Sequence, residues 1–551
     1  MNMKNYLFKQ IIIRVVFFRM IIRLILIITI ILLLISCASQ YPLNPKTSTI
    51  TPVASPEAEK GKLLSPQRSD PFLLLLAFSG GGTRAAALSY GILEALEQVE
   101  VPVQVIEKDA PPSDKKHTLL DEVDFISSVS GGSFTASYYG LHGKNIFKSY
   151  REDFLIKNHQ TALLWNFVNP FNFWFRLLSP RFGRSDMAQE YYDDVIFKGA
   201  KLGDFLKNGN PGIIIQATDA MDGFIFSFTP DMFYMMCSDY KDFPVARAVA
   251  ASAAFPGPLS PIVVKNYAGQ CNYPVPPWIT KSLEKRDLAD RAYFNAVEMS
   301  KFLNTEEKPY AYLIDGGVAD NLGIKGPLES IISRGHVRDV LKEQGLANTR
   351  KVAIIIVDAQ TKEQTKWGLY GKVPGLTLTL GASSGIMVNK SNFETIELLR
   401  RYAQDWTYED EVQGKKPIEF YIIHVTFHKL PDKAEQEYFL DIPTALELPL
   451  QQVDKLREVA GRLLYADSEF QRLLKNLRGH IIDPSQPVKS SEPATGQPVI
   501  VPKPIPAEPV KPPESAPNQP AKAPEPASVQ PVKSLEPAPA KSPASTVPKS
   551  N

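Results

Sequence analysis

Three short, glycine-containing motifs bring together residue types that can transfer an acyl group. They are GGGTR from Gly80, SVSGG around Ser130 and DGG from Asp315. A serine on a sharp turn exposes its hydroxyl, and a carboxylate at the end of a buried strand accepts protons well because partial desolvation raises its pKa. Consecutive glycines let backbone amides approach a negatively charged group. For each motif taken alone, a tight turn without chemical function is the alternative.

Each motif follows an apolar run that has the length of a buried strand. Phe72–Phe78 precedes the glycine loop, residues 123–129 precede Ser130, and residues 310–314 precede Asp315. Residues 83–97 and 134–141 have the composition of helices. This alternation predicts a three-layer α/β/α domain with a mainly parallel sheet, in which ligands bind beyond the carboxyl ends of the strands. Further strands are predicted at residues 212–217, 352–357 and 418–427.

Two other chemistries share part of this pattern. Gly80, Gly82 and Ala85 satisfy a loose dinucleotide-binding fingerprint, and Glu100 has the spacing of its ribose-binding acid, although a Val-Pro pair follows Glu100 directly. A Ser-His-Asp triad is the rival hydrolytic mechanism, but no histidine lies in a triad motif. We expect structural or surface roles for His117, His142, His159, His336, His424, His428 and His480. The sequence contains no metal-ligand cluster, so we expect catalysis without a metal or cofactor.

The order of the three motifs resembles that of the patatin-like phospholipase family. A small-residue stretch from Ala246 to Gly257, which ends in Phe-Pro-Gly, also resembles a helix of that family. The resemblance extends over about residues 72–321. It implies a patatin-like fold and a serine–aspartate dyad hydrolase. Such an enzyme would cleave acyl esters of phospholipids or related lipids, as a phospholipase A-type enzyme or a lysophospholipase.

The resemblance also implies roles for individual residues. Ser130 corresponds to the nucleophile, Asp315 to the general base, and Arg84 to a support of the oxyanion loop. The oxyanion hole would be formed by the amides of Gly80, Gly81 and Gly82. Ser128 departs from the usual Gly-x-Ser-x-Gly pattern, whose first position is glycine. A non-catalytic lipid-binding or scaffold protein that retains the fold is the alternative function.

The N-terminal region has the features of an export signal. Basic residues precede the uncharged stretch 24–36, which is shorter than the roughly 20 residues that cross a bilayer core. The Leu-Ile-Ser sequence before Cys37 resembles a bacterial lipobox, which implies a lipidated Cys37 and a membrane-anchored protein. Ala38 at the next position implies an outer membrane lipoprotein of the bacterial cell envelope. An uncleaved anchor over residues 11–35 is the alternative.

These features divide the chain into four predicted segments. They are a signal peptide at 1–36, a flexible spacer at 37–70, an acyl hydrolase domain with insertions at 71–483 and a disordered Pro-rich tail at 484–551. The tail has no aromatic residue and cannot bury enough surface to fold. We expect it to be a spacer or to dock an envelope partner. The balance of 61 basic and 59 acidic residues excludes a bulk electrostatic attraction to nucleic acid.

Two features of the middle region leave alternatives open. Export would place Cys237 and Cys271 in an oxidising compartment, where they form a disulfide or remain two buried thiols. The aromatic-rich segment 163–178 is a helical hairpin packed on the core or a contact with acyl chains or a membrane. Its candidate lipid-contact residues are Trp165, Phe171, Trp174 and Phe175.

Overall fold

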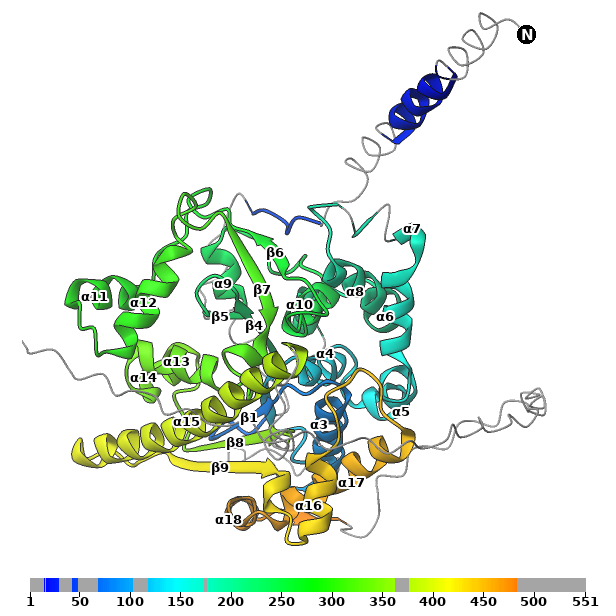
Figure 1. Cartoon of the computed structure of the whole chain (residues 1–551). Coiled ribbons are helices and arrows are strands. Elements are labelled where there is room, and N and C mark those ends of the chain that lie inside the picture. Colours follow the sequence, from blue (N-terminus) through cyan, green and yellow to red (C-terminus); the bar gives the residue numbers. More distant parts are fainter. Residues whose placement is uncertain are drawn as a thin grey trace, which may run out of the picture. The chain divides into compact units, whose positions relative to one another are not determined.

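The computed structural model describes most of the region between residues 68 and 482 (Figure 1). The described residues are 14, 16–28, 42–47, 68–102, 117–172, 176–177, 179–207, 209–361 and 376–482, without the side chains of residues 171, 376–384 and 386–387. Cys37, Trp174, Phe175 and the Pro-rich tail 484–551 therefore lie outside the described residues. Residues 16–28 are helical, and no helix of the described part is long and apolar enough to cross a membrane.

A mixed sheet forms the centre of the domain. Its strands follow the order β6-β7-β4-β3-β1-β8-β9, and β5 pairs with β4. The pairs β4–β3, β3–β1, β1–β8 and β8–β9 are parallel, whereas β7 is antiparallel to both β4 and β6. The strands are β1 (Phe72–Phe78), β3 (Val123–Val129), β4 (Gly212–Asp219), β5 (Ile225–Phe228), β6 (Ile262–Lys265), β7 (Tyr310–Asp315), β8 (Lys351–Asp358) and β9 (Glu419–Thr426).

Helices cover both faces of this sheet. In β1, Leu74 and Leu76 belong to the core that includes α3 (Gly82–Glu97), α4 (Gly131–His142) and α17 (Leu450–Ala466). Leu73 and Leu75 pack on the opposite side against the core formed with α13 (Lys325–Arg334), α14 (Val337–Glu343) and α15 (Leu376–Val412). Because successive side chains of a strand point to opposite faces, the continuous apolar sequence of β1 fits a sheet covered on both sides. The expected three-layer α/β/α arrangement is confirmed.

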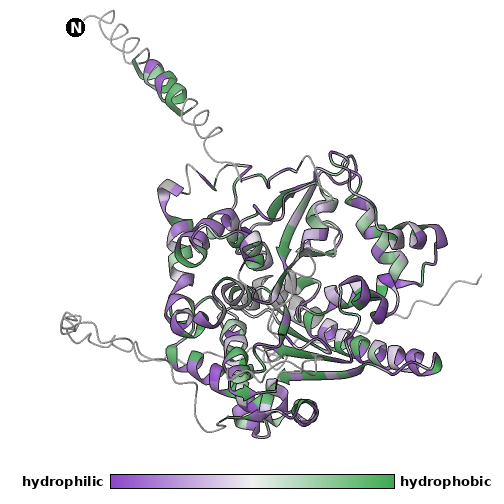
Figure 2. Cartoon of the chain, turned by 180° about the vertical axis from the view of Figure 1, so that it is seen from behind, coloured by the Kyte–Doolittle hydropathy of each residue, from purple (hydrophilic) through white to green (hydrophobic). Residues whose placement is uncertain are grey.

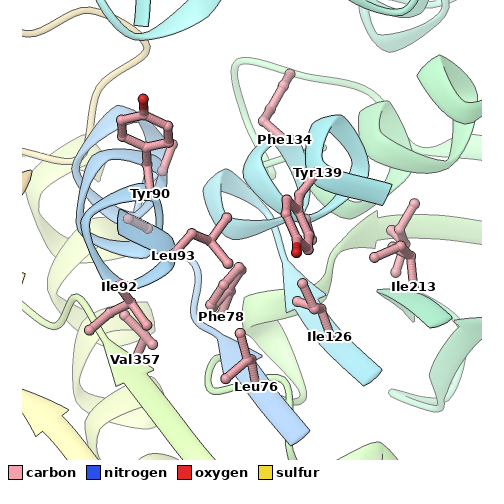
Figure 3. Close-up of a cluster of buried hydrophobic side chains, with 14 of the residues drawn as sticks. Leu76, Phe78, Tyr90, Ile92, Leu93, Ile126, Phe134, Tyr139, Ile213 and Val357 are labelled. Carbon is pink, nitrogen blue, oxygen red and sulfur yellow. The ribbon is translucent and has the colours of Figure 1, made fainter. Parts of the chain in front are cut away.

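The core on the α3 and α4 side is built from large aliphatic and aromatic side chains. Figure 3 shows Phe78, Leu93 and Ile126 close together between the two helices and the sheet. All three side chains are fully buried. Figure 2 shows the strongest hydrophobic colouring along the central strands. Burial on this scale contributes about 1.5–3 kcal/mol per large side chain, so these contacts hold the strand ends that carry the three motifs.

The predicted strands are confirmed with shifts of at most two residues at their ends, and α3 and α4 are longer than predicted. The short strands β5 and β6 and the long helix α15 were not expected from the sequence. Short edge strands carry little periodic signal, and the first half of α15 contains Gly, Ser and Thr, which have weak helix propensity. The remaining elements are β2 (Val99–Glu100), β10 (His480–Ile481), α5 (Ile146–Tyr150), α6 (His159–Val168), α7 (Pro170–Asn172), α8 (Arg184–Tyr192), α9 (Pro230–Met235), α10 (Val245–Ser252), α11 (Pro277–Lys285), α12 (Arg291–Lys301), α16 (Lys433–Leu440) and α18 (Ser468–Leu477).

Part of the segment predicted to be a flexible spacer is ordered. In residues 42–47, Asn44 bonds to Lys265 at the end of the edge strand β6, and Lys46 forms an isolated antiparallel bridge with Ser238. Asn44 is buried there, which corrects the prediction of a flexible chain from 37 to 70. Beside this segment, Cys237 and Cys271 form a disulfide with their Cα atoms 5.6 Å apart, which decides between the two alternatives for these cysteines.

Candidate active site

Ser130 and Asp315 meet at the carboxyl edge of the sheet although they lie 185 residues apart in the sequence. Ser130 follows β3, and Asp315 is the last residue of β7. Strand β4 lies between them, and its register places Gln216 beside Val129 and Ala217 beside Asp315. The Ser130 hydroxyl donates a hydrogen bond of 2.8 Å to Oδ2 of Asp315. The sheet topology therefore brings an alcohol and a carboxylate into direct contact.

The backbone at Ser130 forms a sharp strand-to-helix turn. Its φ of 50° and ψ of −119° lie in a region that non-glycine residues rarely adopt, at a cost of about 1–3 kcal/mol. The two glycines after it allow tight packing of this turn. A Cβ on Gly131 would lie 2.1 Å from the carbonyl oxygen of Gly82, and one on Gly132 would lie 2.7 Å from Phe78. The pair of glycines is thus required by the close approach of the turn to the glycine loop.

A buried serine holds this turn in place. The Ser130 amide donates to the hydroxyl of Ser252 at 2.8 Å, and Ser252 donates in turn to the carbonyl of Gln216 at 2.6 Å. The Ser133 hydroxyl lies 3.0 Å from the same Ser252 oxygen. Ser252 is the last residue of α10, so this helix connects the turn at Ser130 to strand β4. Its role was not foreseen from the sequence, because Ser252 belongs to none of the three motifs.

Burial makes Asp315 a stronger base than a free aspartate. The side chain is removed from solvent, and this desolvation raises its pKa from 3.8 to about 6. Hydrogen bonds from the Gly317 amide, at 2.8 Å, and from Ser130 oppose the shift because they stabilise the carboxylate. Oδ1 is held by Gly317 and Oδ2 faces Ser130, so the carboxylate has a fixed orientation. It can accept a proton at neutral pH.

The glycine loop differs in one respect from the predicted oxyanion hole. The Gly80 amide donates to the carbonyl of Asn321 at 2.9 Å, and it is therefore engaged within the protein. A Cβ on Gly80 would lie 2.6 Å from Oδ1 of the same Asn321. Within the described part of the chain, the amides of Gly81 and Gly82 have no hydrogen-bond acceptor. Two of the three predicted donors are thus unpaired among the described residues, whereas Gly80 fixes the loop to the segment after Asp315.

The Gly131 amide is a further unpaired donor, in addition to those predicted from the sequence. It lies directly after the serine, at the first turn of α4, where helix amides lack intrahelical acceptors. No acceptor for it occurs among the residues that the structure describes. The amide after a nucleophilic serine commonly contributes to an oxyanion hole. The position of Gly131 directly after Ser130 is therefore the sequence feature from which this donor could have been predicted.

Arg84 connects the glycine loop to two other segments of the chain through hydrogen bonds of its guanidinium. Its guanidinium donates to the carbonyls of Ala359 at 2.8 Å and Ile442 at 2.6 Å, and to the Thr444 hydroxyl at 3.0 Å. The Ala445 carbonyl accepts from the amide at position 83, at the start of α3. Burial lowers the pKa of Arg84 to about 10, and Asp358 opposes this shift. Arg84 therefore ties the loop to segment 442–445, which the sequence did not connect with the site.

Ser128 is accommodated inside strand β3. Its hydroxyl donates to the carbonyl of Ile214 at 3.2 Å, and the side chain is buried between strands. The replacement of glycine at this position in the usual motif therefore leaves the turn at Ser130 intact.

The two alternative chemistries find little support in this geometry. A Cβ on Gly82 would lie 2.4 Å from the carbonyl of Ala445, so the close approach of segment 442–445 accounts for a glycine at this position without a bound pyrophosphate. Glu100 lies in β2, which pairs with β10 outside the main sheet. No hydrogen bond among the described residues joins Ser130 to a histidine; His424 instead contacts Asp358 at 3.1 Å. The described residues contain no group of three or more side chains placed to hold a metal ion.

The candidate lipid-contact residues are only partly described. Trp165 is 70% exposed on α6, together with the neighbouring Leu164 and Val168. Phe171 lies in α7, but its side chain is outside the described part. In this segment the structure describes the helices α6 and α7, and the hairpin alternative stays a prediction because residues 173–175 and 178 lie outside the described part. Trp165 is thus a solvent-facing aromatic side chain.

Comparison with known proteins gives one family match. Residues 76–328 match the family described as patatin-like phospholipase. Among solved structures, human GIVD cytosolic phospholipase A2 aligns with a TM-score of 0.39 and 11% identity over 77% of this chain and 67% of that chain. Its complex with methyl gamma-linolenyl fluorophosphonate aligns with a TM-score of 0.37 and 12% identity, over 77% and 64% of the two chains. This chain thus spans about two thirds of the human enzyme. No curated protein matches the sequence.

Proposed function

We propose that the protein is a lipid acyl hydrolase with a Ser130–Asp315 dyad, because residues 76–328 match the patatin-like phospholipase family. The observation that carries this proposal is the 2.8 Å hydrogen bond between the two side chains. The raised pKa of Asp315 supports the role of that residue as a general base. The substrate class is a phospholipid or a related acyl ester, and the reaction is of the phospholipase A or lysophospholipase type.

In the proposed mechanism, Asp315 takes the proton of the Ser130 hydroxyl while the serine oxygen attacks the ester carbonyl carbon. The amides of Gly81, Gly82 and Gly131 stabilise the negative oxygen of the tetrahedral intermediate. The intermediate collapses as Asp315 returns the proton to the departing alcohol, which leaves an acyl-enzyme on Ser130. Water then attacks this ester with Asp315 again as base, and the fatty acid is released. One oxyanion donor in such enzymes contributes roughly 10²–10³ in rate.

The dyad is tested with Ser130→Ala and Asp315→Asn, assayed on phospholipid vesicles and on a soluble short-chain ester. We expect each variant to lose at least about 10³ in kcat on both substrates, with native folding verified by circular dichroism. Ser128→Ala is the matched control, because Ser128 is a buried serine two residues earlier whose hydroxyl donates to the carbonyl of Ile214. Undiminished hydrolysis by both site variants would favour the non-catalytic lipid-binding or scaffold function instead. Analysis of the released products would separate the two hydrolase types.

We also propose that the chain is anchored to the envelope, at the outer membrane, through a lipidated Cys37. The support is the sequence alone, namely the lipobox-like Leu-Ile-Ser-Cys and the export features that precede it. Two or three acyl chains would give a stable anchor, whereas one chain binds membranes only marginally. Mass spectrometry of the purified N-terminus and fractionation of Cys37→Ala cells test this proposal. A Cys37→Ala protein that remains in the outer membrane without acyl groups would refute it.

A further inference from the structure

Residues 42–47, which we call the strap, are fastened to the folded domain by a dense set of hydrogen bonds. Asn44 is 4% exposed, and its amide nitrogen donates to the Ser238 hydroxyl at 2.8 Å and to the Lys265 carbonyl at 3.0 Å. Its amide oxygen accepts from the Lys265 backbone at 2.8 Å. Asn44 thus pairs with both backbone groups of the last residue of β6. An asparagine buried with all these bonds formed holds the chain at one place.

The residues on either side of Asn44 add to this attachment. The Pro45 carbonyl accepts from the Ser238 hydroxyl at 2.7 Å and from the Asp239 amide at 2.9 Å. The amide of Thr47 donates to the carbonyl of Cys237 at 3.0 Å. Cys237 is itself fixed by its disulfide with Cys271. The strap is therefore bound to a covalently cross-linked part of the domain, and its position is rigid relative to the sheet.

The strap lies at the same end of the sheet as the candidate active site, the end where the parallel strands finish. Lys265 pairs with Tyr310 at the start of β7, whereas Asp315 is the end of that strand. Because β7 is antiparallel to β4, the start of β7 projects beyond the carboxyl end of β4. Asp315 meets Ser130 near this same end of β4. Five residues of strand span about 16 Å. The strap is thus attached beyond the carboxyl ends of the parallel strands, where ligands of such sheets usually bind, next to β6 in Figure 1.

Exposed apolar side chains occur in the strap and in the segments next to Asp315. Leu43 in the strap is 53% exposed. Phe255 is 48% exposed and follows Ala254, whose carbonyl accepts from the amide of Asp315. Val318 is 45% exposed and lies three residues after Asp315. The strap and the two segments next to Asp315 thus each present one exposed apolar side chain to a surface that covers this end of the sheet.

We infer that the strap orients the enzyme, so that a lipid anchor at Cys37 holds the Ser130–Asp315 edge against the bilayer surface. This inference rests on the proposed anchor and the proposed lipid hydrolase. Only residues 38–43 separate Cys37 from Asn44, and seven peptide units reach at most about 25 Å when fully extended. A chain that was free up to Arg68 would reach several times farther and would impose no orientation. The partner of this edge is therefore a lipid surface, which is also the source of the substrate.

The inference is tested by lengthening the tether on either side of the strap in the full-length, lipidated chain. One variant receives about 20 Gly and Ser residues between Ser39 and Gln40, and a matched control receives the same insertion between Ala54 and Ser55. Since effective concentration falls with about the −3/2 power of tether length, the first insertion should lower hydrolysis of bilayer lipid about eightfold. It should leave hydrolysis of a soluble short-chain ester unchanged. The second insertion lies after the strap and should change neither activity.

A second variant tests the attachment itself. Asn44→Ala should lower bilayer hydrolysis severalfold in the lipidated chain and leave soluble-ester hydrolysis unchanged, and the exposed Lys46→Ala is its control. Equal bilayer activity of the two insertion variants, or an equal loss on both substrates in Asn44→Ala, would overturn the inference. Failure of the underlying proposals is seen separately. Ser130→Ala with full activity refutes the dyad, and Cys37→Ala that retains membrane binding and bilayer activity refutes the anchor together with the orienting role.

Discussion

The backbone amide of Ser130 is held by the hydroxyl of Ser252, 122 positions away in the sequence, at a distance of 2.8 Å. Ser252 accepts this bond while donating its own proton to the carbonyl of Gln216. The strained backbone of Ser130 is thus fixed by a side chain on α10 and not by the turn alone. Ser252 is a positioning residue, because it touches the backbone of the proposed nucleophile and not the reacting oxygen.

Ser252→Ala should therefore lower kcat and leave KM nearly unchanged. The Ser130 amide would lose its buried acceptor at a cost of about 1–3 kcal/mol. If this cost raises the energy of the conformation in which Ser130 faces Asp315, the rate decreases about fivefold to 150-fold. Steady-state kinetics on a soluble ester measure both constants. Ser128→Ala, which removes a hydroxyl from the adjacent strand, should alter kcat less than twofold. A change confined to KM, or equal effects of the two variants, would contradict the positioning role.

The pH dependence of the reaction should follow the ionisation of Asp315. Its pKa of about 6 means that the carboxylate, the form able to accept the serine proton, disappears as the pH falls through 6. We expect kcat/KM on a soluble ester to be half-maximal near pH 6 and to fall about tenfold per pH unit below it. Circular dichroism at each pH separates this effect from unfolding. A flat profile between pH 5 and 8 would exclude Asp315 as the general base.

Asp315→Asn should stabilise the fold at neutral and alkaline pH while it abolishes activity. Desolvation raises the pKa of Asp315 from 3.8 to about 6, so the native state binds this proton more tightly than the unfolded state does. The free energy of unfolding of the wild type therefore falls as the pH rises from about 4 to 6, and it stays lower above pH 6. The asparagine variant lacks this penalty, which amounts to about 3 kcal/mol at most. Urea titrations at pH 8 and pH 3.5 should show a difference at the higher pH that vanishes at the lower one.

Polar replacement of the exposed surface of α6 should weaken action on bilayers selectively. Trp165 is 70% and Val168 is 55% exposed, so the double change Trp165→Ser with Val168→Ser removes apolar area without disturbing the core. If this surface contacts lipid, bilayer hydrolysis should fall about fivefold to tenfold, which corresponds to roughly 1–1.4 kcal/mol of surface affinity. Soluble-ester hydrolysis should not change. Tyr408→Ser, at an equally exposed position of α15, is the control, and equal losses on both substrates would exclude lipid contact.

The sequence alone determined the local geometry of each motif. Continuous apolar runs predicted strands buried on both faces, and the Ser-x-Gly-Gly and Asp-Gly-Gly motifs predicted turns at their ends. These predictions held because they depend on neighbouring residues: the glycines after Ser130 are needed wherever a strand turns sharply into a helix beside another backbone. The lipobox-like sequence at Cys37 likewise depends on adjacent residues, and its role stays a prediction.

Only the tertiary structure decided what surrounds these motifs. Ser252, the segment that holds Arg84, and the Asn321 carbonyl that engages the Gly80 amide all lie outside the three glycine-containing motifs. The same is true of Asn44, in a segment whose composition predicted a flexible spacer. Their contacts join residues tens to hundreds of positions apart. Strand order and register bring such residues together, and the local amino-acid composition determines neither strand order nor register.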